Sequence, residues 1–264
     1  MRRDLFAFLL AVTIVVSCSS TSLASEEASI FAAENFSSTL ILTSDYVCEG
    51  VSYSDQDPAI QGTIDYYHPG TGIFVGLWGS SWDDGGVSND IELGGWVGQA
   101  GALGPITYDV AAYYWIYPGA EDEGFEYDYF QAGINLSHTF EEAFLSPSLK
   151  VGYLWSPEYS GEEGTSHKFM SQLGLSLMYG FRMELEAGHY DIEGGNITGN
   201  GGGLDGGDGY DWEYYRVGLS RDLIAGFNVD LSYHINSEDE FFKEYYGGKD
   251  IADNRLVFTL SRTF

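Results

Sequence analysis

Apolar and polar residues alternate with a period of two along the last nine residues of the chain. Because side chains on an extended strand point alternately to its two faces, this segment predicts a strand with one apolar and one mostly hydroxylated face. A soluble sandwich can also contain such a strand, so the weight of the pattern depends on its repetition. The apolar face carries Leu256, Phe258, Leu260 and Phe264.

The same alternation recurs in segments bounded by Gly, Pro, Asn or Asp residues. In the segment 181–192, Arg182, Glu184 and Glu186 face away from Met183 and Leu185. This requires water on one side of the sheet and an apolar medium on the other. The predicted strands fall near residues 38–49, 57–68, 72–82, 90–99, 105–117, 126–138, 147–157, 166–179, 181–192, 211–222, 226–237 and 253–264.

The connections between these segments alternate in length. Long, acidic connections are expected at residues 50–56, 83–89, 118–125, 158–165, 193–210 and 238–252, and short ones between them. Bacterial outer-membrane barrels pair short periplasmic turns with long extracellular loops. The sequence therefore predicts an all-β fold, a transmembrane up-and-down antiparallel β-barrel of about 12 strands with short periplasmic turns and long acidic extracellular loops.

The first residues have the layout of a secretory signal peptide, with Arg2 and Arg3 before an apolar run and small residues up to Ala24. The run is too short to cross a bilayer as a helix, which needs roughly 20 apolar residues. The residues before Cys18 also resemble a lipoprotein signal, and this alternative stays open. We expect a signal peptide over 1–24, a periplasmic lead-in over 25–37 and the barrel over 38–264.

The chain has 40 acidic and 11 basic residues and a net charge of −29, which excludes nucleic acid as a partner. Its 35 Gly, 20 Tyr and 16 Phe residues suit strands, tight turns and aromatic girdles at membrane interfaces. Most tryptophans are expected in such girdles, although Trp96 and Trp115 fall on inward positions. Cys48 has no disulfide partner after signal cleavage and is expected to be an ordinary strand residue.

Three motifs follow one another near the N-terminus of the predicted barrel: LTSDYVCEGVSYS (42–54), DPAIQG (57–62) and GIFVGLWGS (72–80). Their order and spacing resemble the TorF-type porin family, conserved hypothetical outer-membrane proteins of proteobacteria. The resemblance implies an outer-membrane barrel and a porin function, without a substrate. Cys48 and Glu49 stand where that family usually has an aromatic residue and Arg, so no anion preference carries over.

The sequence contains no recognisable catalytic or metal-binding arrangement. The Gly-rich and Asp-rich stretch 193–210 loosely resembles a calcium-binding repeat, but it occurs once. We therefore expect no enzyme activity, no metal and no cofactor. The five histidines lie one to a strand or turn, with no pair at metal-ligand spacing: His68, His138, His167, His189 and His234.

The polar faces of the predicted strands hold many ionisable residues, most of them acidic. A channel wall with an excess of one charge raises the concentration of the counter-ion, so this lumen favours cations. The alternative is that the basic residues pair with the acids in a network that fills the lumen. The candidate pore-lining residues are Asp45, Asp65, Glu92, Asp109, Lys150, Arg182, Glu184, Glu186, Arg216, Asp230 and His234.

Two functions fit these features best. The first is a porin in the outer membrane of a Gram-negative bacterium, which lets small hydrophilic solutes diffuse passively and prefers cations. The second is a closed structural or adhesive barrel whose acidic loops bind partners, and a soluble exported β-protein is a third alternative. We expect contacts with outer-membrane lipid, with lipopolysaccharide and, during insertion, with the barrel-assembly machinery. The apolar face of the last strand would be the insertion signal, and the oligomeric state is left open.

Overall fold

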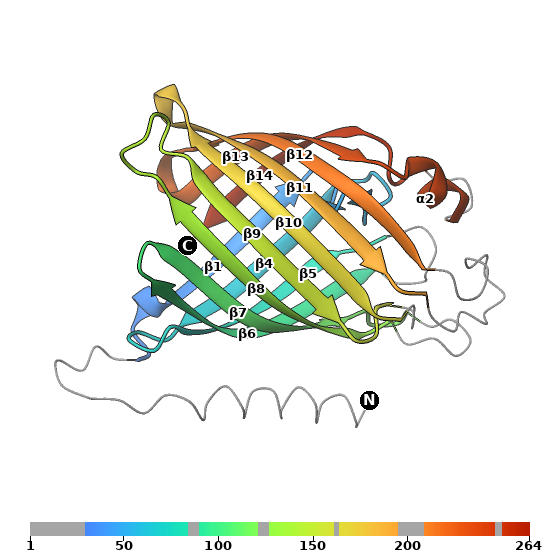
Figure 1. Ribbon diagram of the computed structural model, residues 1–264, viewed down its shortest axis with the longest axis horizontal. Coiled ribbons are helices and arrows are strands. Elements are labelled where there is room, and N and C mark those ends of the chain that lie inside the picture. The colour runs from blue at the N-terminus through green and yellow to red at the C-terminus, as the bar shows by residue number, and fades with distance from the viewer. Residues whose placement is uncertain (1–29, 84–89, 121–126, 161–163, 195–208, 246–249) are drawn as a thin grey trace.

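The computed structural model describes residues 30–83, 90–120, 127–160, 164–194, 209–245 and 250–264. Twelve antiparallel strands form one closed barrel, in which successive wall strands pair and the first pairs with the last (Figure 1). The predicted up-and-down barrel is confirmed. The expected signal peptide, and residues 195–208 of the Gly-rich stretch, lie outside the described residues.

Among the described residues, no helix has the length and apolar character needed to cross a bilayer. The elements outside the wall are η1 (Ala33–Asn35), β2 (Val47–Cys48), β3 (Val51–Ser52), η3 (Met178–Gly180), η4 (Ile224–Gly226) and α2 (Asp239–Tyr245). The wall strands are β1 (Phe36–Thr43), β4 (Ala59–Tyr67), β5 (Ile73–Ser81), β6 (Ile91–Leu103), β7 (Ile106–Ile116), β8 (Tyr129–Thr139), β9 (Ser148–Ser156), β10 (Ser166–Ser176), β11 (Phe181–Ile192), β12 (Tyr210–Asp222), β13 (Phe227–Asn236) and β14 (Arg255–Thr263).

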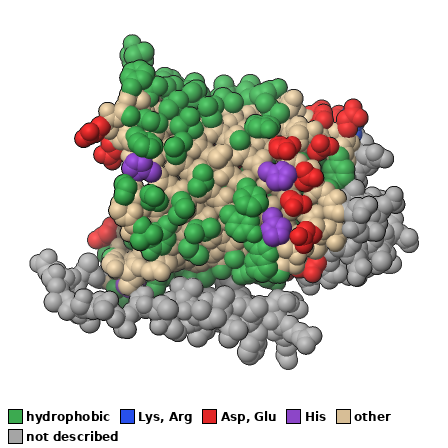
Figure 2. Space-filling model, viewed as in Figure 1, with side chains coloured by type: hydrophobic (Ala, Val, Ile, Leu, Met, Phe, Trp, Pro, Cys, Tyr) green, Lys and Arg blue, Asp and Glu red, His purple; other side chains and the backbone are tan. Residues whose placement is uncertain are grey.

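The two faces of the wall differ as the alternation predicts. Residues that pair across a ladder point to the same side, and one such row is Met183, Leu219, Leu231 and Phe258. Leu219, Leu231 and Phe258 are between 42% and 51% exposed. On the face that Figure 2 shows, hydrophobic side chains are spread over the outer wall as an apolar belt, and acidic side chains gather at the end where the long connections lie.

Short and long connections lie at opposite ends of the barrel, which we call the turn end and the loop end (Figure 1). At the turn end, two turns reverse the chain in the same way, through positive φ at Tyr179 and Gly180 and at Ala225 and Gly226. A side chain at Gly226 would also place its Cβ 2.3 Å from the carbonyl oxygen of Thr263. Glycine is therefore required there both by conformation and by space.

Two predictions about local structure are wrong. The first strand runs from Phe36 to Thr43 and does not continue to Glu49, and it overlaps the expected lead-in by two residues. Most tryptophans do not form an outer girdle. Trp78 and Trp212 donate hydrogen bonds inside the barrel, to Glu92 and to the backbone carbonyl of Glu49. Trp115 faces inward as expected and donates to Gln131. A wide lumen with many polar acceptors accommodates these large side chains.

The closed wall predicts heat-dependent migration on a denaturing gel. Because every wall strand is paired on both sides, detergent has no free edge at which to begin unfolding. We expect an unboiled sample of the membrane fraction to migrate differently from a boiled one. Release of the protein in soluble form by osmotic shock, with no difference on boiling, would contradict a membrane-inserted barrel.

Candidate functional site

The first long connection, residues 44–58, folds back into the barrel. It contains the short ladder between β2 and β3, and its turn has positive φ at Glu49 and Gly50. We call residues 44–58 the inner hairpin. Because it starts at the loop end of β1 and contacts β10 and β12 on the other side of the barrel, it fills part of the lumen at the loop end.

A small apolar core surrounds the inner hairpin inside the lumen. Val51 of the hairpin is 2% exposed, and Tyr190 stacks on Trp212 with ring centroids 4.7 Å apart. The core joins the hairpin to β11, β12, α2 and the connection before β14, so packed side chains fill this part of the lumen at the loop end. Its members are Val51, Tyr190, Ile192, Trp212, Tyr214, Phe242, Ile251 and Ala252.

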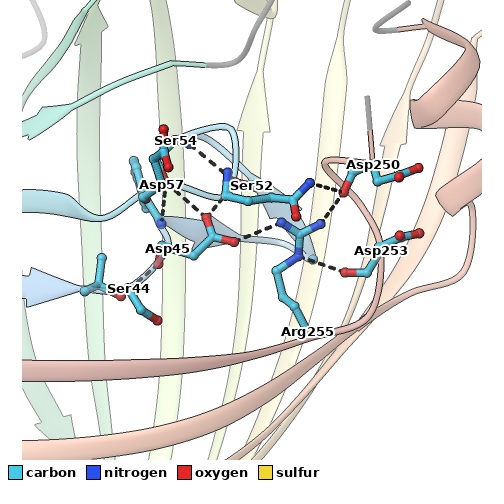
Figure 3. A network of polar contacts seen from close by, with 12 residues as sticks. Ser44, Asp45, Ser52, Ser54, Asp57, Asp250, Asp253 and Arg255 are labelled. Carbon is cyan, nitrogen blue, oxygen red and sulfur yellow. Dashed lines mark hydrogen bonds and ion pairs between the residues drawn. The ribbon is translucent and has the colours of Figure 1, made fainter. Parts of the chain in front are cut away.

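Asp45 anchors the base of the inner hairpin (Figure 3). The hydroxyl groups of Ser52 and Ser54 donate to its Oδ1 at 2.6 and 3.0 Å, and Arg255 Nη1 donates to its Oδ2 at 2.9 Å. The side chains of Asp45 and Arg255 are only 8% and 11% exposed. Arg255 also donates to two backbone carbonyls of the connection before β14, which fixes its guanidinium in position.

Glu49 anchors the tip of the inner hairpin on the opposite wall. Its carboxylate forms an ion pair with Lys168 of β10, and the two side chains are 10% and 14% exposed. Trp212 Nε1 donates to the backbone carbonyl oxygen of Glu49 at 2.9 Å. The Lys168 ammonium lies 5.8 Å from the ring centroid of Tyr190, within the range of a cation–π contact.

Glu92 of β6 holds a third part of the inner hairpin. It is 3% exposed and accepts hydrogen bonds from Tyr46 at 2.9 Å, Trp78 at 2.7 Å and Tyr117 at 3.0 Å. Tyr46 belongs to the hairpin, and the other two donors belong to the wall and its rim. The carboxylate is therefore satisfied by neutral donors and has no ion-pair partner among the described residues.

The other predicted lining residues lie on the inner face of the wall. Arg216 bridges two of them, with Nη1 2.7 Å from Glu184 Oε1 and Nη2 2.8 Å from Asp230 Oδ1. His234 Nε2 lies 3.0 Å from Ser232 Oγ.

Two further acids accept hydrogen bonds from amides: Asp109 from Asn135 at 2.8 Å and Glu186 from Gln172 at 2.6 Å. The last three predicted lining residues border cavities, and no described ion pair includes them: Asp65, Lys150 and Arg182.

The inner hairpin lies between two cavities. A cavity of about 430 Å³ extends toward the turn end, where Arg182 and Asn228 line it, and Asp45 and Tyr46 border it from the hairpin. A second cavity of about 240 Å³ lies against β6 to β10, with Cys48 and other hairpin residues in its lining. Both are bordered by charged and hydroxylated side chains, as expected for a wet lumen.

Sequence reasoning missed Lys168 and Arg255 as lumenal residues, and with them the pairing of Glu49. The signal was present in the alternation. Lys168 shares its parity with Gln172 of β10, and Arg255 with Thr259 of β14, which pairs with the lumenal Asp230. Among the lumenal residues named above, eight are acids and five are bases: Asp45, Glu49, Asp65, Glu92, Asp109, Glu184, Glu186 and Asp230 against Lys150, Lys168, Arg182, Arg216 and Arg255. Asp222 of β12 pairs with Asn228 of the cavity lining and adds a further acid at the turn end.

One cluster outside the lumen was not foreseen. Pairing of β11 with β12 sets His189 opposite Glu213, and with Asp211 these side chains bring ligand atoms within 4.8 Å of one another on the outer wall. Both acids are exposed. His189 is 22 or more residues from both acids in sequence, so no metal-ligand spacing could be recognised.

Comparison with known proteins gives a family and a fold. Residues 27–264 match the family described as "Bacterial protein of unknown function (Gcw_chp)". The NanC porin superposes with a TM-score of 0.54 at 10% identity, covering 86% of this chain and 98% of that one. The KdgM porin "in complex with disordered oligogalacturonate" has a TM-score of 0.50 at 5% identity, covering 87% and 97%. At such identities the likeness shows the barrel fold alone.

No protein sequence with a curated description matches the chain. The expected TorF name is therefore not confirmed, whereas a family of bacterial proteins without a known function is shown.

Proposed function

We propose that this chain, which belongs to the Gcw_chp family of bacterial proteins of unknown function, is an outer-membrane channel for passive diffusion of small hydrophilic solutes. The observation that carries the proposal is the contrast between the two faces of a closed wall. The outer face is an apolar belt (Figure 2), and the inner face carries the charged network described above. This division suits lipid outside and water inside.

In the proposed orientation the loop end is extracellular and the turn end is periplasmic, as in bacterial barrels with short periplasmic turns. The acidic side chains beyond the apolar belt would then face lipopolysaccharide, with divalent cations between them. The final strand, with its apolar face from Leu256 to Phe264, would be presented to the barrel-assembly machinery during insertion.

The lumenal charges support a preference for cations. Three bases are used in ion pairs within the lumen, Arg216 with Glu184 and Asp230, and Lys168 and Arg255 with the inner hairpin. Only Lys150 and Arg182 remain outside described ion pairs, against three partly exposed acids, Asp65, Asp109 and Glu186, and the buried Glu92. The acidic excess that faces water attracts cations, since a wall of one sign concentrates the counter-ion.

The charge balance of the lumen also bears on the class of solute. The KdgM porin is described in complex with disordered oligogalacturonate, a ligand that bears carboxylates. Eight acids and five bases favour the opposite charge, so we propose small neutral or cationic solutes for this chain.

A closed structural barrel is the second candidate, and the inner hairpin favours it. The apolar core around Val51 and Trp212 fills part of the loop end, and the two cavities lie on different sides of the hairpin. A barrel that keeps this arrangement permanently would span the membrane without conducting ions.

Conductance of the refolded protein in a planar bilayer separates the two candidates. A channel gives discrete current steps, and its reversal potential in a salt gradient reports the preferred ion. We expect current steps, and a reversal potential whose sign shows that potassium permeates more easily than chloride. Complete absence of conductance, in the wild type and in hairpin variants alike, would favour the structural barrel.

Neutralising Glu186 tests the origin of selectivity. Glu186→Gln removes a lumenal charge while keeping an acceptor for Gln172, so we expect a weaker potassium preference at 0.1 M salt, where the screening length is about 10 Å. The difference should vanish near 1 M, where that length is about 3 Å. Glu141→Gln, on an exposed turn, is the matched control and should leave the reversal potential unchanged.

A further inference from the structure

We propose that the inner hairpin is a gate that leaves the lumen as a unit when its ion pairs with the wall are broken. The inference rests on the proposed channel function for its biological meaning, but the movement itself is tested separately. The gate would have two latches, Asp45 with Arg255 at its base and Glu49 with Lys168 at its tip.

The position of the hairpin in the wall permits this movement. Its two ends follow Thr43 of β1 and precede Ala59 of β4, and these two residues pair with each other in the wall. Ser44 stays on the wall, because its N–H donates to the Phe258 carbonyl of β14 at 2.9 Å. The segment after Ser44 can therefore move without breaking any bond between wall strands. Its backbone bonds to the rest of the barrel are few, among them Ser52 N–H to the Ile251 carbonyl at 2.7 Å and Asp83 N–H to the Tyr53 carbonyl at 2.9 Å.

The chemistry of the latches suits a reversible closure. A buried ion pair gains little over its separated and hydrated partners, because both charges lose water on closing. Outward movement would return Asp45 and Glu49 to water. Breaking one pair while the other charge stays buried is strongly unfavourable, so loss of either wall cation drives the hairpin outward.

Backbone conformation within the hairpin points the same way. Glu49, Asp55 and Gln56 have φ angles of 54°, 48° and 68°, three of the seven non-glycine residues with positive φ in the described chain. Such conformations persist only where surrounding contacts impose them, and they are common at switch regions. These three conformations belong to the closed arrangement, and release of the hairpin would let the residues leave them.

Opening would remove the barrier between the two cavities. Cys48 lines the inner cavity of about 240 Å³, and Tyr46 of the same segment covers Glu92. Withdrawal of the hairpin would expose Glu92, Lys168 and the lumenal aromatic side chains to the solute path. The open lumen is then continuous from the turn end to the loop end.

Labelling of Cys48 with a polymer-tagged maleimide tests the movement. The tag is far larger than the cavity beside Cys48, so the thiol reacts only when the hairpin is outside, and each product shows as a mass shift on a gel. The refolded mature chain is used. If the protein prepared still contains residue 18, Cys18 is replaced by Ser so that Cys48 is the only thiol. Lys168→Met breaks the tip latch, and Lys150→Met is the control, because Lys150 lines the same cavity without a described ion pair.

We expect Lys168→Met to raise the labelling rate at least about ten-fold. The free-energy change that gives a ten-fold rate is well below the cost of leaving a buried charge unpaired. Lys150→Met should stay within about two-fold of the wild type. The double variant Glu49→Gln with Lys168→Met removes both charges and should restore slow labelling, a rescue that general loss of folding would not give.

Unchanged labelling in Lys168→Met and in Glu49→Gln, in barrels that still show heat-dependent migration, would overturn the gate and make the hairpin a fixed plug. Should Lys168→Met fail to fold, Glu49→Gln alone decides the question. Fast labelling together with a lack of conductance in every variant would support movement of the hairpin but contradict the channel function.

Discussion

Replacing Arg255 with Met is expected to lower the free energy of unfolding by up to about 3–5 kcal/mol, the usual cost of leaving one partner of a buried ion pair uncompensated, and by less if outward movement of the inner hairpin returns Asp45 to water. Arg255 pairs with Asp45 at 2.9 Å, and both side chains are almost withdrawn from water. The substitution also frees the carbonyl oxygens of Asp250 and Asp253, which Arg255 binds. Urea unfolding of the refolded barrel in lipid vesicles measures the change.

A double-mutant cycle separates the ion pair from the packing of Arg255. Asp45→Asn with Arg255→Met removes both charges, so we expect the double variant to be more stable than Arg255→Met alone. The coupling between the two sites should be clearly larger than the few tenths of a kcal/mol found for independent sites. Additive effects would show that Asp45 and Arg255 do not depend on each other.

Alternation was sufficient to predict most of the wall. From Phe227 to Asn236, each residue suits either the lipid on one side of the wall or the water on the other. Its direction therefore depends only on its own position in the strand, and the directions of Leu231 and Asp230 follow from the sequence. The lumenal acids were found for the same reason. The predicted strands differ from those observed mainly at their ends, except for the first.

The inner hairpin could not be predicted in this way. Residues 44–49 continue a plausible strand pattern after β1, and the chain leaves the wall at Ser44 without a glycine or proline. What holds it inside is distant in sequence, since Glu49 pairs with Lys168 and Asp45 with Arg255. Alternation shows that these cations face inward, but it does not show which acid each one meets.

The aromatic side chains illustrate the same limit. A tryptophan near a strand end suits the interface between lipid and water, and nothing local distinguishes it from one that faces a polar lumen. Trp78 and Trp212 are fixed by acceptors that come from other parts of the chain, the Glu92 carboxylate and the Glu49 carbonyl. Their inward direction follows from the closed barrel and from these contacts together.

Placing a charge on the lipid-facing side of the wall should have an effect of similar size. Leu231 lies near the middle of β13, in the apolar row with Leu219 and Phe258. Leu231→Arg is expected to cost about 2–4 kcal/mol, the range for Arg near the bilayer midplane in an outer-membrane barrel. Urea unfolding in vesicles, with the wild type in parallel, measures this cost.

The control must face the lumen at a position with space for a long side chain. Ser232, the neighbour of Leu231, is 2% exposed and bonded to His234, so it does not qualify. Ser220 lines the cavity of about 430 Å³ and pairs across the ladder with Asp230. Ser220→Arg should therefore change stability by only about 0.5 kcal/mol and shift permeation toward anions. Equal losses of stability in Leu231→Arg and Ser220→Arg would show that the two sides of the wall are not lipid and water.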